Sequence, residues 1–229
     1  MSFKKEKQIT VWMIGDSTMS VKKENTYPET GWGMPFADLF NDKVVVENKA
    51  MNGRSTLSFI REKRWQDVYD GLKEGDYLII EFGHNDEKVD KPGVGTTPDE
   101  YKANLARFVT EARSKKAIPI LMTSIARRNF KDGRLIDTHK NYPDVVRNLA
   151  DSLRVPLIDM QQKTEKLLTR YGEEKSIALF NYVDSGHVNY PKGKKDNTHL
   201  SPVGAKAVAD CAVEGMKELK LPLAKYLKH

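Results

Sequence analysis

Cysteine is almost absent from this 229-residue sequence: Cys211 is the only one, which excludes a disulfide within the chain. No apolar run approaches the ~20 residues that a membrane-spanning helix needs. No basic tract with interleaved aromatic residues favours nucleic acid, and linker segments and internal repeats are missing. We therefore predict one soluble domain over residues 1–229 that binds neither membrane nor nucleic acid.

The first residues, MSFKKEKQITVWM, are basic but lack the long apolar segment of a secretory signal. Their apolar part is already needed as a strand. We expect a cytoplasmic protein, in agreement with the single cysteine. A chain from which a signal had been removed would read the same.

Charge is plentiful but nearly balanced, with 38 lysines and arginines against 32 aspartates and glutamates, a net charge of +6. The two signs are interspersed, which is typical of a solvated surface. The slight basic excess favours an anionic substrate. The length is sufficient to bury one sizeable core.

Short apolar runs alternate with amphipathic segments along the chain. Strand character is found at 9–15, 44–48, 77–82, 118–123 and 155–159. Helical character is found at 34–40, 55–72, 99–115, 142–153, 160–171 and 201–219. This alternation predicts a three-layer α/β/α fold with a five-stranded parallel sheet, as in flavodoxin, and a loop-rich segment at 172–198.

In such sheets the ligand site lies outside the carboxyl ends of the strands. This rule brings together the loops that hold Ser17, Gly53 and Asn85, and the loop of Asp196 and His199 can join them. A helix is expected to open at 16–18, and a serine at that turn, surrounded by free N–H groups, suits a nucleophile. Taken singly, each of these residues also fits a helix cap or a turn.

Four short sequence blocks resemble those of a known enzyme family. They read GDSTM at 15–19, NGRS at 52–55, GHND at 83–86 and DNTH at 196–199. In this order they resemble the catalytic blocks of the SGNH (GDSL-like) hydrolases, and they look most like the rhamnogalacturonan acetylesterase branch. The first block departs from a literal GDSL.

The resemblance implies a serine hydrolase that needs no cofactor and no metal. Ser17 would be the nucleophile, His199 its base, and Asp196 the carboxylate that orients the imidazole. The backbone N–H groups of Ser17 and Gly53 and the side-chain amide of Asn85 would form the oxyanion hole. His139 and His187 lack partners at ligand-like spacing, so a metal site is not expected.

The implied substrate is an acetylated acidic oligosaccharide of pectic rhamnogalacturonan. The enzyme would remove its acetyl groups through an acyl-serine intermediate. Arg54 and His84 are the predicted substrate-binding residues. Four further side chains are candidates for contact with a uronate or a sugar ring: Arg127, Arg128, Trp32 and Tyr190.

Other functions remain open at this point. The same site fits an SGNH esterase for xylan or sialate acetyl groups, a lysophospholipase or a thioesterase. An inactive carbohydrate-binding protein is less favoured, because all the catalytic residue types are present. The sequence predicts no oligomeric state, nor whether the loops at 22–30 and 172–198 close over the substrate.

Overall fold

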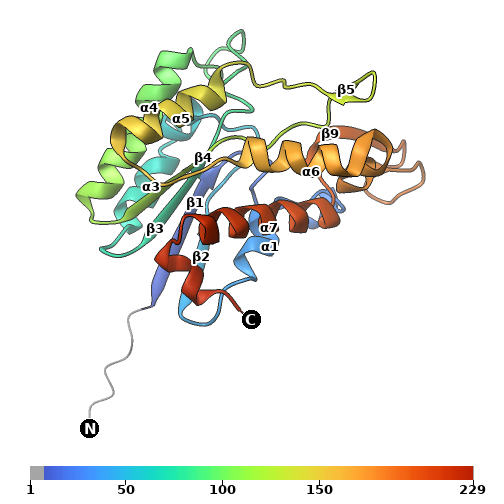
Figure 1. The fold of residues 1–229 in the computed structure, drawn as a ribbon. Coiled ribbons are helices and arrows are strands. Elements are labelled where there is room, and N and C mark those ends of the chain that lie inside the picture. The colour runs from blue at the N-terminus through green and yellow to red at the C-terminus, as the bar shows by residue number, and fades with distance from the viewer. Residues whose placement is uncertain (1–7, 229) are drawn as a thin grey trace.

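A computed structural model describes residues 8–228. Its centre is a parallel sheet of five strands in the order β2-β1-β3-β4-β7, the order of flavodoxin (Figure 1). The strands are β1 (Ile9–Gly15), β2 (Val44–Asn48), β3 (Tyr77–Glu81), β4 (Ile118–Met122) and β7 (Leu157–Ile158). The predicted α/β fold and five-stranded parallel sheet are confirmed.

Helices cover both faces of this sheet (Figure 1). They are α1 (Gly33–Ala37), α2 (Thr56–Arg61), α3 (Arg64–Gly71), α4 (Pro98–Ser114), α5 (Tyr142–Leu153), α6 (Met160–Lys175) and α7 (Pro202–Glu218). Side chains of β1 alternate between two cores: Val11 and Met13 pack with α1, α6 and α7, whereas Ile14 packs with α3, α4 and α5. Every residue of β3 is buried, as expected for a strand covered on both faces.

Two predicted helical stretches differ from the structure. The residues at 16–18 form a turn rather than the start of a helix, and only the 3-10 helix η1 (Glu24–Thr26) and then α1 follow. The stretch at 55–72 is divided into α2 and α3, because Lys63 has a positive φ of 60°. Apolar periodicity does not reveal either backbone change.

The segment at 172–198 is more regular than predicted. Helix α6 is kinked at Gly172, where φ is 75°, and ends at Lys175. The 3-10 helix η2 (Ser176–Leu179) follows, and β8 (Phe180–Val183) pairs antiparallel with β9 (Lys194–Leu200). Asp196 and His199 therefore lie on a strand, not on a loop. The β9 sequence KKDNTHL is almost entirely polar, so it lacks the alternation that identifies a strand.

The remaining elements are short. A small hairpin joins β5 (Phe130–Lys131) to β6 (Arg134–Leu135), and η3 (Pro222–Tyr226) lies near the C-terminus. Ser201 caps α7 by accepting the Gly204 N–H at 3.1 Å, as its place before Pro202 predicts. Over residues 8–228, no helix combines the length and apolar character needed to cross a membrane.

Candidate active site

The turn after β1 presents Ser17. Oδ1 of Asp16 accepts hydrogen bonds from the backbone N–H and the hydroxyl of Thr18, both at 2.9 Å, and this closes the turn. Gly15 is required just before it, since a Cβ there would lie 2.6 Å from the carbonyl oxygen of Glu81. The turn leaves Ser17 9% exposed at the carboxyl end of β1.

A chain of hydrogen bonds joins the three predicted catalytic side chains. Ser17 Oγ lies 2.9 Å from Nε2 of His199, and Nδ1 of His199 lies 2.8 Å from Oδ2 of Asp196. The second oxygen of Asp196 accepts the backbone N–H groups of Thr198 at 2.9 Å and His199 at 3.0 Å. This geometry fits a serine activated by an imidazole that a carboxylate orients.

Asp196 is suited to holding a negative charge. Burial by itself would raise the pKa of its carboxyl, but the hydrogen bonds from the ring and backbone of His199 hold that pKa well below its usual range. An ionised Asp196 keeps the proton of His199 on Nδ1. The lone pair of Nε2 is then free to accept the Ser17 proton.

The predicted oxyanion residues lie on loops at the same edge of the sheet. Gly53 has a φ of +75° and is exposed, with no atom within 4 Å of where a Cβ would stand. Backbone conformation, rather than close packing against the protein, therefore favours glycine here. Asn85 is 5% exposed, and its Nδ2 donates to the carbonyl oxygen of Arg54 at 3.1 Å.

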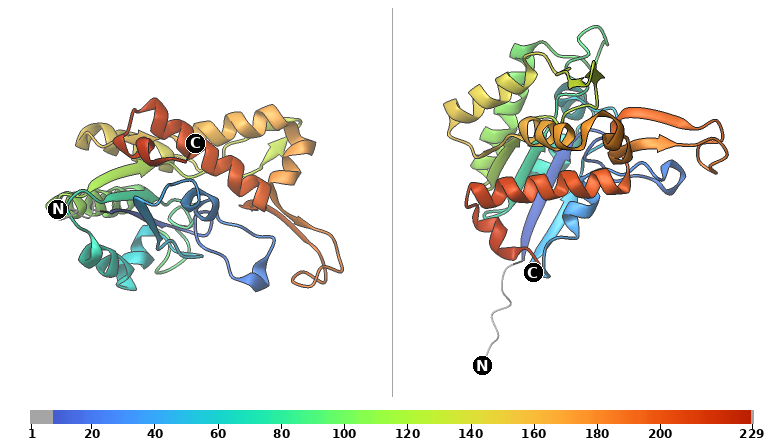
Figure 2. Two further views of the ribbon diagram at one scale, coloured as in Figure 1. Left: turned by 90° about the horizontal axis from the view of Figure 1, so that it is seen from below. Right: turned by 45° about the vertical axis from the view of Figure 1, so that its right-hand side comes forward.

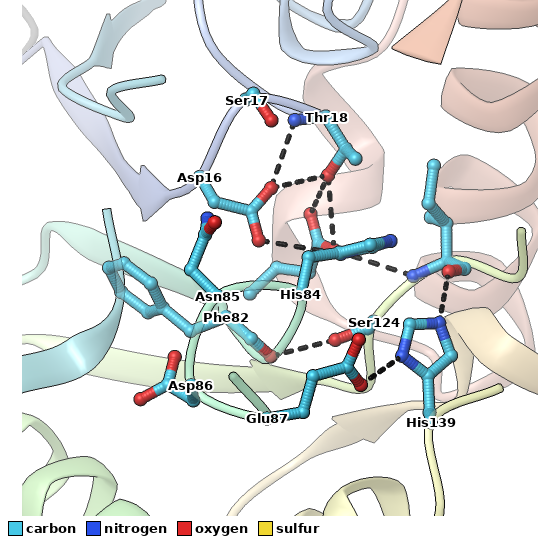
Figure 3. A network of polar contacts seen from close by, with 12 residues as sticks. Asp16, Ser17, Thr18, Phe82, His84, Asn85, Asp86, Glu87, Ser124 and His139 are labelled. Carbon is cyan, nitrogen blue, oxygen red and sulfur yellow. Dashed lines mark hydrogen bonds and ion pairs between the residues drawn. The ribbon is translucent and has the colours of Figure 1, made fainter. Parts of the chain in front are cut away.

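A buried polar cluster supports the nucleophile turn (Figure 3). Glu81 accepts hydrogen bonds from Trp32 Nε1 at 3.0 Å and from the Thr18 hydroxyl at 3.4 Å. Burial, and secondly the nearby Asp16 carboxyl, raise the pKa of Glu81 well above its ordinary value. Trp32 is fully buried, so the expectation that its ring stacks on a sugar is wrong.

His84 belongs to this cluster as well. Its side chain is only 3% exposed, with Nδ1 3.4 Å from Oδ2 of Asp16 and its ring edge-to-face with that of His139. Burial lowers the pKa of His84 to about 4, although Asp16 opposes this, so the ring is neutral at neutral pH. This burial argues against the predicted substrate contact, and His84 is a packing residue behind the turn (Figure 3).

The three arginines predicted to contact substrate differ in their exposure and their partners. Arg128 is 8% exposed and donates to Asn197 and Ser176, both at 3.1 Å, so it braces β9 and does not reach the rim. Arg127 forms an ion pair with Glu87. Arg54 remains partly exposed, with Nε 3.0 Å from a Glu62 oxygen.

Two loops beside the site are joined. Nδ2 of Asn189 donates to the carbonyl oxygens of Glu24 at 3.0 Å and Tyr27 at 2.8 Å. The Tyr190 hydroxyl donates to the carbonyl oxygen of Thr26 at 2.7 Å. These hydrogen bonds hold the loop at 22–30 to the turn of the β8-β9 hairpin, and the two segments lie side by side in both views of Figure 2.

Sequence reasoning missed Lys88 and the bracing role of Arg128. Lys88 Nζ donates to Oδ1 of Asn85 at 2.8 Å, and its position three residues after Asn85 in the GHNDEK run was a usable signal. Arg128 has no comparable signal, because its partners lie 48 and 69 residues away. Among residues 8–228, no group of three or more His, Cys, Asp or Glu side chains is placed to hold a metal ion.

Comparison with solved structures shows the same fold. The YxiM protein of Bacillus subtilis superposes with a TM-score of 0.81 at 23% identity, over 94% of this chain and 58% of that one. Axe2, an acetylxylan esterase of Geobacillus stearothermophilus, superposes with a TM-score of 0.65 at 19% identity, over 91% and 94% of the two chains.

Sequence comparison reveals closer relatives. Rhamnogalacturonan acetylesterase RhgT of Bacillus subtilis (strain 168) is 43% identical over 225 residues, which are 97% of this chain and 95% of the relative. The probable rhamnogalacturonan acetylesterase YesY of the same strain is 32% identical, over 93% and 94% of the two chains. The sequence profile described as the GDSL-like Lipase/Acylhydrolase family matches residues 13–207. The chain therefore belongs to the GDSL-like lipase/acylhydrolase family.

Proposed function

We propose that this protein is a carbohydrate O-acetylesterase that removes acetyl groups from pectic rhamnogalacturonan oligosaccharides. The observation that carries the proposal is the hydrogen-bonded chain Ser17–His199–Asp196 in a protein 43% identical to RhgT. The three side chains supply a nucleophile, a base and an orienting carboxylate, which together are sufficient for ester hydrolysis.

The first half of the proposed reaction acylates the enzyme. Ser17 Oγ attacks the acetyl carbonyl carbon while its proton passes to Nε2 of His199. The oxyanion of the tetrahedral intermediate accepts hydrogen bonds from the N–H groups of Ser17 and Gly53 and from the Asn85 amide. One such donor is typically worth about 3 kcal/mol of barrier. His199 then protonates the sugar oxygen, and the C–O bond to the sugar breaks.

The second half of the proposed reaction hydrolyses the acetyl-serine. A water molecule gives a proton to His199 Nε2 as its oxygen attacks the acetyl carbon. The same donors stabilise the second oxyanion. Collapse breaks the bond to Ser17 Oγ, which regains its proton from His199, and acetate leaves. No step draws on a group other than these side chains, the backbone and water.

An acidic oligosaccharide is the proposed substrate class. The net charge of +6 supports a uronate-bearing substrate, and Arg54 next to Gly53 would meet the uronate carboxylate by giving up its ion pair with Glu62. We further propose that the chain folds as a single domain. A cytoplasmic location stays a prediction, which cell fractionation tests.

The decisive experiment measures acetate release from acetylated rhamnogalacturonan oligosaccharides. Acetylated xylan and p-nitrophenyl esters from acetate to decanoate are assayed in parallel. Release from the pectic substrate and from short esters alone is the expected result. A preference for long esters without sugar activity would overturn the substrate class, and inactivity on every substrate would indicate a binding protein.

A further inference from the structure

A groove of about 730 Å³ opens between the two joined loops. Residues of the loop at 22–30, including Lys22 and Tyr27, form one wall. His187, Val188 and Asn189 of the hairpin turn form the other. Both loops project side by side from the same edge of the molecule (Figure 2). Nothing in the proposed chemistry occupies this groove.

The groove adjoins the oxyanion loop. Lys22, at its inner end, donates from Nζ to Oδ1 of Asn52 at 2.7 Å, and Asn52 directly precedes Gly53. The Ser20 hydroxyl donates to the same oxygen at 2.6 Å. The groove therefore lies next to the loop that carries Gly53.

The two walls of the groove are bonded to each other. The hydrogen bonds of Asn189 to Glu24 and Tyr27, and of Tyr190 to Thr26, join its two walls across more than 160 residues of sequence. A surface that is already ordered loses less conformational entropy when it binds a ligand.

The lining offers groups that suit a sugar, beside the exposed apolar side chain of Val188. Tyr27 is 57% exposed, which leaves its ring available to stack on the apolar face of a sugar. Nδ1 of His187 accepts the Asn189 N–H at 3.1 Å, so the neutral ring carries its proton on Nε2 as a donor for a hydroxyl. Lys22 is neutralised by Glu29 at 2.7 Å, so this pair provides no strong charge for a lone anion.

We propose that this groove binds the sugar residues that flank the acetylated one. The proposal rests on the carbohydrate esterase function above. In this proposal Tyr27 and His187 recognise the length of the oligosaccharide. Both residues lie outside the four sequence blocks at 15–19, 52–55, 83–86 and 196–199.

The test compares Tyr27→Ala, His187→Ala and Tyr27→Phe with the wild type. The measured quantity is kcat/KM on acetylated rhamnogalacturonan oligosaccharides divided by kcat/KM on p-nitrophenyl acetate. We expect this ratio to fall about tenfold in both alanine variants, chiefly through KM, and to be retained by Tyr27→Phe. Leu219→Ala, an exposed apolar residue just beyond α7, is the matched control.

Three outcomes would overturn the proposal. They are an unchanged ratio in both alanine variants, a loss confined to long p-nitrophenyl esters, and equal loss in Tyr27→Phe and Tyr27→Ala. If the wild type releases no acetate from sugars, the proposed carbohydrate substrate class fails. Calorimetric titration of the oligosaccharides into Ser17→Ala, with and without Tyr27→Ala, then decides whether the groove binds sugars at all.

A separate observation concerns Asn85. Its Oδ1 accepts from Lys88 Nζ at 2.8 Å, and its Nδ2 donates to the Arg54 carbonyl at 3.1 Å. An ammonium only donates and a carbonyl only accepts, so both partners demand the same orientation of the amide. The second hydrogen of Nδ2 stays free for an oxyanion.

We infer that Lys88 is a positioning residue for Asn85. The positively charged ammonium of Lys88, which donates to Oδ1, polarises the Asn85 amide. This strengthens the Nδ2–H donor that the proposed mechanism uses. Removal of the charge would weaken that donor and allow the amide to rotate. The inference rests on the oxyanion role proposed for Asn85.

Lys88→Met tests this inference. We expect kcat on p-nitrophenyl acetate to fall about tenfold with little change in KM, and Lys88→Arg to restore most of it. In an Asn85→Ala background the substitution should cause no further loss. Lys91→Met, at an exposed lysine three residues on, is the control. A loss seen only with uronate substrates, no loss at all, or full additivity with Asn85→Ala would overturn the inference.

Discussion

Arg128 and Asn197 are joined twice. The Arg128 backbone N–H donates to the Asn197 carbonyl at 2.9 Å, and its Nη1 donates to the Asn197 side chain at 3.1 Å. Asn197 lies between Asp196 and His199, the two residues of β9 proposed to be catalytic, so this contact sets where the proposed base meets Ser17. The guanidinium also donates to Ser176 and to the Glu173 carbonyl, which ties α6 to the same strand.

Replacement of Arg128 by methionine should therefore weaken both activity and stability. The buried Ser176 hydroxyl would lose its donor, at about 1–3 kcal/mol of unfolding free energy, and the part-buried hydrogen bonds to Asn197 and Glu173 would be lost as well. We expect kcat to fall at least about tenfold, because a small misplacement of His199 is costly. Steady-state kinetics and urea unfolding are the measurements, with exposed Arg134→Met as the control. A folded Arg128→Met variant with wild-type kcat would contradict the bracing role.

The triad itself gives a second prediction. Ser17→Ala and His199→Ala should each abolish acetate release, whereas Asp196→Ala should leave a small residual rate, because it removes orientation rather than the nucleophile. Thermal unfolding and labelling by a serine-directed phosphonate accompany the kinetics. Turnover near the wild-type rate in the Ser17 variant would exclude this mechanism.

Gly53 offers a test of backbone conformation. Gly53→Ala meets no neighbouring atom but places a side chain at a φ of +75°, which costs about 1–2 kcal/mol. Gly133→Ala is a matched control, with a φ of +74° and equally open space. The two variants should lose similar unfolding free energy, and only Gly53→Ala should lose kcat. Because alanine keeps the backbone N–H, equal kcat in both would contradict the prediction by showing that a Cβ at residue 53 disturbs neither the donor nor the bound substrate.

Asp86 should make stability depend on pH. It accepts hydrogen bonds from Thr56 and Thr96, but burial dominates and raises the pKa of its carboxyl from 3.8 to about 7. The folded state then holds this proton more tightly than the unfolded state. The contribution of Asp86 to stability is therefore full below pH 3.8 and is lost as the pH rises to about 7.

Urea unfolding of the wild type and Asp86→Asn across pH 4 to 8 measures this effect. The free energy of unfolding of the wild type should decline relative to that of the variant between about pH 4 and 7 and then run parallel. A constant difference across the range would show that the Asp86 pKa is not raised.

The sequence by itself determined the fold class and the place of the site. Apolar runs such as YLIIE at 77–81 identify buried strands, and their alternation with helices allows few arrangements other than a parallel sheet. The carboxyl ends of such strands share one edge, so Ser17, Gly53 and Asn85 had to lie together. These features are local patterns combined with a general rule of topology.

Only the tertiary structure decided how distant segments meet. The polar strand β9, which carries His199 to within 2.9 Å of Ser17, has no apolar pattern. Contacts with Arg128 and the loop at 22–30 hold the β8-β9 hairpin in place. Burial likewise separated Trp32 and His84 from the exposed candidates. Burial and hydrogen bonding depend on partners many residues away, so local sequence patterns do not predict them.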